Sequence, residues 1–194
     1  MWKVNKTSHF NTILLVLIVF GTVISCGSSS RVAKGNDDMQ SLDSLMANEN
    51  FEVRSNWAMP LATNSMNSLA NAGLFPPGSS AGQINLIGNP NYVKIIGDSL
   101  SVYLPYFGER QMGGGYNSDG AGIDFEGIPE KMEITKNKAK KRYDIRIKMK
   151  DDSENFILNI NLFPNFTSAV NVNSSQRFPI RYSGSVQAIT TEDR

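Results

Sequence analysis

Polar and apolar residues alternate along the C-terminal half of the chain. From Tyr143 to Met149 every second residue is apolar and the residues between are charged, and apolar residues recur at every second position from Phe156 to Leu162. A period of two places successive side chains on opposite faces of a strand. Asp151-Asp152-Ser153, between the two runs, is typical of a turn. This pattern predicts an antiparallel hairpin with one buried face and one solvent-exposed face.

Shorter runs of the same kind fill most of the chain after residue 50. Phe51, Val53, Ser55 and Trp57 alternate with polar residues, so we expect these four side chains on one face of a strand. Gly, Asn, Asp, Ser and Pro separate the runs. The sequence predicts an all-β antiparallel sandwich or half-open barrel of about nine or ten strands. The other expected strands lie at 84–87, 92–96, 100–104, 123–126, 132–136, 169–172 and 178–189.

A short helical pattern precedes the strands. Asp37 or Asp38 is suited to cap a helix, and four apolar residues follow at helical spacing. We expect a short N-terminal helix whose apolar face packs on the core. Residues 61–83 show neither period and are expected to form a loop. The apolar residues of the expected helix are Met39, Leu42, Leu45 and Met46.

The N-terminus carries two lysines and then an apolar run from Ile13 to Ile24. The run is shorter than the roughly 20 residues that a membrane-spanning helix needs, and Gly27 and three serines follow its end. Val23-Ile24-Ser25-Cys26 resembles the lipobox of bacterial lipoproteins, in which cleavage precedes a cysteine that is then acylated. An ordinary secretory signal is the alternative.

We therefore expect three segments: residues 1–25 as a lipoprotein signal peptide, 26–37 as the lipidated Cys26 with a flexible tether, and 38–194 as a single mostly-β domain. Acylated Cys26 predicts attachment to a lipid bilayer. Gly27 follows the cysteine. In known lipoprotein sorting signals an aspartate at this position favours the inner membrane, and by resemblance to these signals the outer membrane is expected. No acidic cluster follows closely, and we expect the domain to face the periplasm.

Composition limits the chemistry of the mature chain. Loss of 25 residues from 194 leaves 169, enough for one domain, and loss of Lys3 and Lys6 leaves 17 basic side chains against 18 acidic ones. This balance gives no signal for nucleic acid, which is not expected as a partner. The sole histidine, His9, lies in the signal, and the sole cysteine is Cys26. A mature chain without His or a free Cys has no Ser-His-Asp triad and no His-bearing zinc site, and we expect no cofactor and no metal.

The chain contains five notable short blocks: Asn91-Tyr92, Gly97-Asp98, Leu104-Pro105-Tyr106-Phe107-Gly108, Gly122-Ile123-Asp124-Phe125 and Tyr182-Ser183-Gly184. These blocks resemble the family called domain of unknown function 4251, a group of Bacteroidetes envelope lipoproteins. The resemblance extends over roughly residues 51–186. It implies one domain and a membrane anchor, and it offers neither an activity nor catalytic or binding residues.

The Leu104–Gly108 block places two aromatic rings at the end of an expected strand, next to Pro and Gly. Tyr106 and Phe107 either plug one end of the core or, with Tyr116, contact a ligand that is small and hydrophobic, a glycan or a peptide. No catalytic residue stands out, so we expect a non-catalytic binding or scaffolding module. The alternative is a carboxylate-dependent hydrolase of envelope glycans that uses Asp124 and Glu126, on one strand face.

Nine basic residues between Lys131 and Lys150 leave a further choice open. Lysines on a solvated strand discourage pairing with other sheets, which is the usual reason for them. The same charges also suit anionic lipid headgroups near the anchor.

Overall fold

The computed structural model describes residues 37–111, 122–151 and 153–189. Ten antiparallel strands in these residues form one curled sheet in the order β5-β4-β3-β1-β10-β9-β8-β7-β6, with β2 paired to β1 beside this path. The all-β antiparallel prediction is confirmed in its half-open barrel form. The strands are β1 (Asn50–Met59), β2 (Ile84–Asn85), β3 (Tyr92–Ile96), β4 (Ser99–Leu104), β5 (Ile123–Gly127), β6 (Lys131–Asn137), β7 (Arg142–Asp151), β8 (Glu154–Leu162), β9 (Thr167–Ser174) and β10 (Ile180–Ala188).

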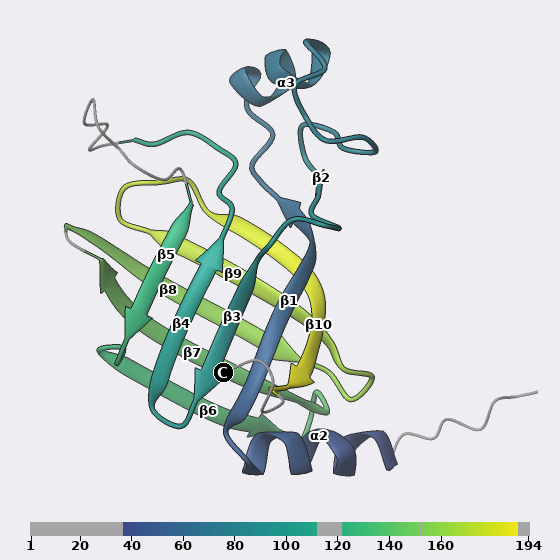
Figure 1. Ribbon diagram of the computed structural model, residues 1–194, viewed down its shortest axis with the longest axis vertical. Coiled ribbons are helices and arrows are strands. Elements are labelled where there is room, and N and C mark those ends of the chain that lie inside the picture. The colour runs from purple at the N-terminus through teal and green to yellow at the C-terminus, as the bar shows by residue number, and fades with distance from the viewer. Residues whose placement is uncertain (1–36, 112–121, 152, 190–194) are drawn as a thin grey trace, which may run out of the picture. The chain divides into compact units, whose positions relative to one another are not determined.

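The sheet curls into two layers that cross each other (Figure 1). We call β5, β4, β3 and β1 the front layer and β10, β9, β8, β7 and β6 the back layer, because this is how Figure 1 shows them; β1 and β10 pair where the layers join. Alternate residues of the strands point between the layers: Val102 in the front layer and Leu158 in the back layer are buried, and Met132 and Ile134 of β6 are partly buried. The alternation seen in the sequence thus makes one continuous core, with the polar residues on the outer faces.

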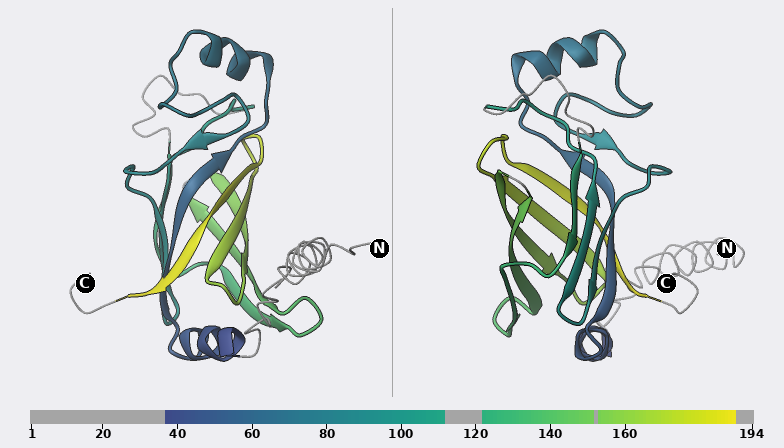
Figure 2. Two further views of the ribbon diagram at one scale, coloured as in Figure 1. Left: turned by 90° about the vertical axis from the view of Figure 1, so that its right-hand side faces the viewer. Right: turned by 60° about the vertical axis from the view of Figure 1, so that its left-hand side comes forward.

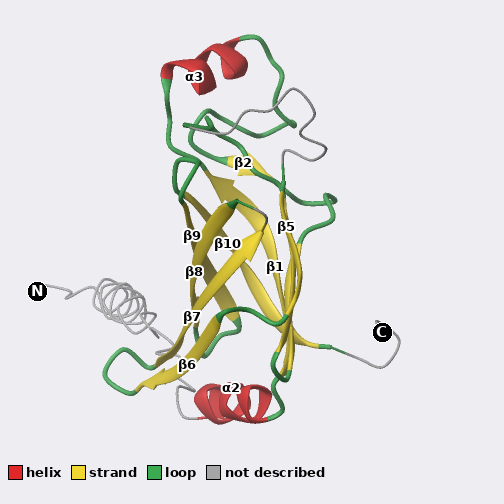
Figure 3. Cartoon of the chain, turned by 90° about the vertical axis from the view of Figure 1, so that its left-hand side faces the viewer, coloured by secondary structure: helices red, strands yellow, loops and turns green. Residues whose placement is uncertain are grey.

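Two helices lie at opposite ends of the curled sheet (Figure 3). Helix α2 (Asp37–Ala47) buries Leu42, Leu45 and Met46 against the core, which confirms the predicted N-terminal helix. Helix α3 (Asn64–Asn71) corrects the expected loop at 61–83: the Thr63 side chain accepts a hydrogen bond from the backbone N–H of Met66 and caps it. Helix α3 spans eight residues and Met66 is its buried residue, so the segment is too short and too exposed to stand out in the sequence as a helix.

Strand β1 contains a bulge that reverses the faces of its last residues. Ser55 pairs with Gly184, and the next pair is Trp57 with Ser183, so one residue of β1 has no partner on β10. An extra residue shifts the alternation by one position. Ala58, not Trp57, therefore joins Phe51, Val53 and Ser55 on the buried face. The prediction that Trp57 shares that face was wrong.

Residues 35–194 form one compact unit that contains every core residue described above. Such a unit, with its own core, is expected to fold without the preceding residues. None of the helices described in the structure is long and apolar enough to cross a membrane. The expected signal peptide, Cys26 and most of the tether lie outside the described residues.

Candidate functional site

The corner after β4 contains the two aromatic residues singled out in the sequence. Tyr106 and Phe107 are partly buried and pack against the core. The Tyr106 hydroxyl lies 3.1 Å from the carbonyl oxygens of both Glu109 and Phe178. Burial raises the pKa of Tyr106, against the opposing effect of the nearby Arg177 charge. The corner is thus tied to the segment before β10, far away in the sequence.

A buried ion pair lies beside this corner. Arg177 Nε donates to both carboxylate oxygens of Glu154, at 2.9 and 3.1 Å, and Arg110 donates to Glu154 at 2.9 Å. The Arg177 guanidinium also lies 5.1 Å from the Tyr106 ring centre, a cation–π distance. Burial alone would raise the pKa of Glu154, but the hydrogen bonds from Ser174 and the two arginines hold it below the ordinary value. These contacts connect the ends of β8, β9 and β4.

This arrangement uses the polar atoms of the corner for contacts within the protein. The Tyr106 hydroxyl and the Arg177 guanidinium face protein groups, and Glu154 is almost fully buried. We interpret the corner as a structural plug of the core. Ligand contact by Tyr106 and Phe107 stays a prediction, and Tyr116 lies outside the described residues.

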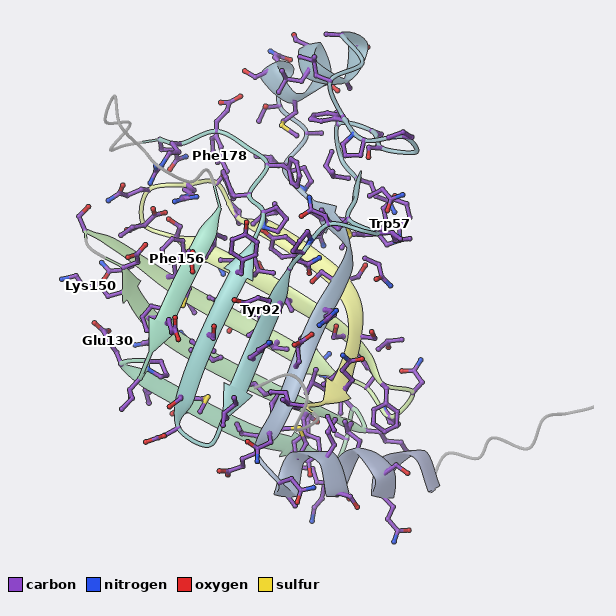
Figure 4. All side chains as sticks on the ribbon, viewed as in Figure 1. Trp57, Tyr92, Glu130, Lys150, Phe156 and Phe178 are labelled. Atoms are coloured by element: carbon purple, nitrogen blue, oxygen red, sulfur yellow. The ribbon has the colours of Figure 1, made fainter. Side chains whose placement is uncertain are left out.

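The outer face of the front layer carries a different pair of aromatic side chains. Tyr92 on β3 pairs with Tyr103 on β4, and their ring centres are 6.0 Å apart. Tyr103 is 44% exposed, and Asp124 on β5 lies opposite it in the next strand. Figure 4 labels Tyr92 in the layer nearest the viewer. These pairings place an aspartate and two tyrosines in one row across three strands.

The neighbouring row on this face is charged. Lys94 pairs with Glu52 on β1 and with Ser101 on β4, and Ser101 pairs with Glu126 on β5. Lys94 Nζ lies 3.4 Å from the Glu52 carboxylate and 4.8 Å from the Tyr92 ring centre. Arg54 forms a second ion pair with Glu52, which is 2% exposed although it belongs to the outer face. The two cations cover Glu52 and leave their own outer surfaces to solvent.

Two surface grooves meet at Lys94. One, of about 260 Å³, passes Ile96, Ser101 and Glu126, and the other, of about 510 Å³, passes Tyr92 and Asn56 beside the bulge. Tyr92 lines the larger groove, and Ser101 and Glu126 of the charged row line the smaller one. We call the outer side of the front layer the front face and define it by Tyr92, Tyr103, Lys94, Asp124 and Glu126.

A third groove, of about 430 Å³, lies on the outer side of the back layer. Its lining is polar apart from one isoleucine, and it includes Asp144, Arg146, Asn159 and Asn161. Asp144 is engaged by hydrogen bonds from Asn137 and Asn161 at 3.0 and 2.8 Å. No aromatic ring lines this groove among the described residues, so the front face is the better candidate for a ligand.

Asp124 and Glu126, the acids of the hydrolase alternative, both lie exposed on the outer side of β5. They are two residues apart on a strand at the edge of the sheet. Glycosidases place their two carboxyl groups on either side of the bond that is cut, and one is held in surroundings that raise its pKa. In the described part of the chain no third acid, His or Cys joins them to form a metal-binding group. Hydrolysis by this pair stays a prediction.

Sequence reasoning had not selected the tyrosine pair, although a signal existed. Tyr92 and Tyr103 occupy outward positions in two segments that the alternation identified as strands. Their adjacency depends on the register of the hairpin, which turns at Gly97 with a φ of 59°. Without that register the two rings cannot be placed side by side.

Comparison with known proteins identifies the family. A sequence model described as Domain of unknown function (DUF4251) matches residues 33–186. The chain belongs to this family. The crystal structure of a DUF4251 family protein from Bacteroides eggerthii is similar to it, with a TM-score of 0.51 and 12% sequence identity, over 78% of this chain and 88% of that chain. At this identity the similarity shows a shared fold. No curated protein matches the chain.

Proposed function

We propose that this DUF4251 protein is a lipid-anchored, non-catalytic binding module of the outer membrane, and that its front face binds an envelope glycan in the periplasm. The observation that carries the binding proposal is the row formed by Tyr92, Tyr103 and Asp124. The lipobox at Cys26 supports the anchor, and the family resemblance supports the envelope.

A glycan suits the front face better than the other ligand classes. Tyrosine rings offer a flat apolar face and a polar edge, which complement the C–H faces and the hydroxyl groups of sugar rings. Lys94, Ser101 and Glu126 supply donors and acceptors beside the rings. A peptide would more readily add to an unpaired sheet edge, and a small hydrophobic ligand requires an enclosed apolar pocket.

The anchor is tested in cells with a traceable fatty acid. Wild-type protein is expected to take up the label and to fractionate with the outer membrane, whereas Cys26→Ala is expected to lose both properties. Label that persists in Cys26→Ala would overturn the anchor. The variant leaves the domain intact because residue 26 precedes the compact unit.

Binding is tested with the fragment 35–194 and soluble glycan strands from peptidoglycan freed of their peptides, by titration calorimetry. The double variant Tyr92→Ala/Tyr103→Ala is expected to weaken binding at least about tenfold, as loss of a central aromatic contact typically does. Leu74→Ala is the matched control, since Leu74 is an apolar side chain, 68% exposed, outside the front face. Equal affinity of the double variant and the control would contradict the proposal, as would binding of peptides alone.

The same strands distinguish binding from hydrolysis. A binding module is expected to release no new reducing ends during long incubation. Release by the wild type, lost in Asp124→Asn or Glu126→Gln, would replace the binding proposal with the hydrolase.

A further inference from the structure

The turn between β6 and β7 carries a cluster of three exposed lysines. Lys138, Lys140 and Lys141 lie exposed in this turn, and no carboxylate of the described residues pairs with them. The turn has a defined conformation: the Asn137 side chain accepts a hydrogen bond from Lys140 N–H at 3.0 Å, and Lys141 has a φ of 48°. The three lysines therefore extend from a turn with a defined backbone conformation.

Protection of a sheet edge does not explain these three lysines. Strand β6 is an edge of the sheet, and Lys131 and Lys136 on that strand fit the protective role. Both of these form ion pairs, with Glu133 and Asp43 at 2.6 Å each. Lys138, Lys140 and Lys141 follow the end of β6 and have no strand edge to guard.

The turn lies at the end of the domain where the N-terminal tether enters. The last residues of β6 and the first of β7 contact helix α2: Lys136 Nζ and the Tyr143 hydroxyl lie 2.6 and 2.7 Å from the two carboxylate oxygens of Asp43. Figure 2 shows the turn beside α2. Only ten residues separate Cys26 from Asp37 at the start of α2. An anchor at Cys26 would therefore hold this end of the domain closest to the bilayer.

Two acids next to the ends of β6 and β7 are already paired with cations. Asp43 is occupied by Lys136, and Asp144 pairs with Arg142 at 2.6 Å. Two exposed acids, Glu49 and Asp98, belong to turns of the front layer, whereas the lysine turn extends from the back layer.

We propose that Lys138, Lys140 and Lys141 dock the α2 end of the domain on the anionic phospholipid headgroups of the membrane that holds the anchor. This inference rests on the proposed membrane attachment and adds an orientation to it. Each lysine near an anionic surface contributes about fivefold to binding, and the effect decays over a Debye length of roughly 8–10 Å. Docking at this end directs the front and back layers away from the bilayer, so that both outer faces stay accessible to partners.

The test is co-sedimentation of the fragment 35–194 with vesicles at low salt. The vesicles contain phosphatidylcholine alone or with phosphatidylglycerol as a minor component. We expect binding to the anionic vesicles, release when salt is raised, and no binding to the neutral ones. The double variant Lys138→Glu/Lys140→Glu is expected to lower the partition coefficient at least about 25-fold. Lys141 is left unchanged because its positive φ makes it part of the turn.

The matched control is Lys148→Glu/Lys150→Glu, which changes the net charge equally. Lys150 lies eight residues beyond Arg142 along β7, about 27 Å away, and Figure 4 shows it at the far side of the sheet from α2. The control is expected to bind nearly as well as the wild type. If both double variants lost binding equally, the vesicles would attract the protein only by its net charge, and the docking proposal would be wrong. Unchanged vesicle binding by Lys138→Glu/Lys140→Glu would also overturn the proposal. Because the fragment lacks Cys26, these outcomes are independent of whether the chain is acylated.

Discussion

Gly184 on β10 lies directly against the backbone of Arg54 on β1. A Cβ atom at Gly184 would be 1.9 Å from the Arg54 carbonyl oxygen and 2.7 Å from the Cα of Ser55. Such contacts are far inside van der Waals distance, and the obstructing atoms are backbone. The close approach occurs where Ser55 pairs with Gly184, next to the bulge that turns Trp57 outward. The join between the two layers therefore requires glycine at this position.

Gly184→Ala is expected to destabilise the fragment 35–194 by about 2–3 kcal/mol or more, since overpacking forces strand shifts. The free energy of unfolding is measured in urea. Gly82→Ala is the control, because its added Cβ would meet the nearest atom, Ala62 Cβ, only at 4.0 Å. If both variants had similar free energies of unfolding, β1 would be able to shift away from the added Cβ atom without loss of stability.

The side chain of Asn91 replaces a missing strand partner for the same stretch of β1. Asn91 Oδ1 accepts from Ser55 N–H at 2.7 Å, and Asn91 Nδ2 donates to the Ser55 carbonyl at 2.9 Å. Regular pairing of β1 with β3 ends at Val53 and Val93. Asn91→Ala leaves two buried backbone groups without partners and is expected to cost about 2–4 kcal/mol.

Asn173→Ala, at an exposed position on β9, provides the comparison and is expected to stay within about 0.5 kcal/mol of the wild type. Both variants are measured by urea unfolding, and Asn91→Ala should also speed amide exchange at Ser55. Unchanged protection of Ser55 would contradict the proposed role of the Asn91 amide.

The family blocks recognised in the sequence acquire structural roles. Asn91 forms hydrogen bonds with the backbone of Ser55 on β1, Gly97 lies in the turn of the β3–β4 hairpin, and Gly184 allows β10 to approach β1 closely. The Tyr182 hydroxyl donates to the Pro105 carbonyl at 2.9 Å, which links the C-terminal block to the aromatic corner. These residues specify how the sheet folds, which explains why their pattern alone points to no chemistry.

The alternation of apolar and polar residues was sufficient to predict the strands, because each strand buries one face and the resulting period of two can be recognised in the sequence. The bulge in β1 could not be predicted from the sequence, because it depends on Gly184 and Asn91, which are distant in sequence from Trp57. Helix α3 was missed because it spans only eight residues and buries only Met66 among them. The front face required strand register, since Asp124, Tyr103 and Tyr92 become neighbours only through two pairings.

The Glu154–Arg177 pair predicts a pH dependence of stability. The pKa of Glu154 lies below its ordinary value of 4.5 in the folded protein: burial raises it, but hydrogen bonds from Ser174 and Arg177 outweigh that effect. A lowered pKa gives stability that is fully present above the unfolded value and is lost as pH falls through the folded value. The wild type is therefore expected to lose stability as pH falls below about 4.5.

Glu154→Gln removes this dependence and leaves Arg177 buried without its counter-charge. At neutral pH the variant is expected to be about 3–5 kcal/mol less stable. The gap to the wild type should narrow steadily in acid, as urea titrations at several pH values would show. A constant gap would mean that Glu154 is not the titrating group. The exposed substitution Asp124→Asn serves as the comparison for loss of one carboxylate.

Tyr143 provides the corresponding prediction at alkaline pH. Burial, and then the hydrogen bond to the Asp43 carboxylate, raise the pKa of Tyr143 to about 12 from an ordinary 10. Because the unfolded phenol ionises first, this contribution to stability is full below pH 10 and is lost as pH rises towards 12. The pH titration of tyrosinate absorbance is measured for the wild type and for Tyr143→Phe, and the second curve is subtracted from the first. The difference should show one phenol that ionises at a higher pH than an ordinary tyrosine. Asp43→Asn should bring that titration back towards 10 while α2 stays docked through Leu42 and Met46. A difference curve centred at 10 in the wild type would exclude the Asp43–Tyr143 hydrogen bond, which is one of the two contacts that join the hairpin to Asp43 of α2.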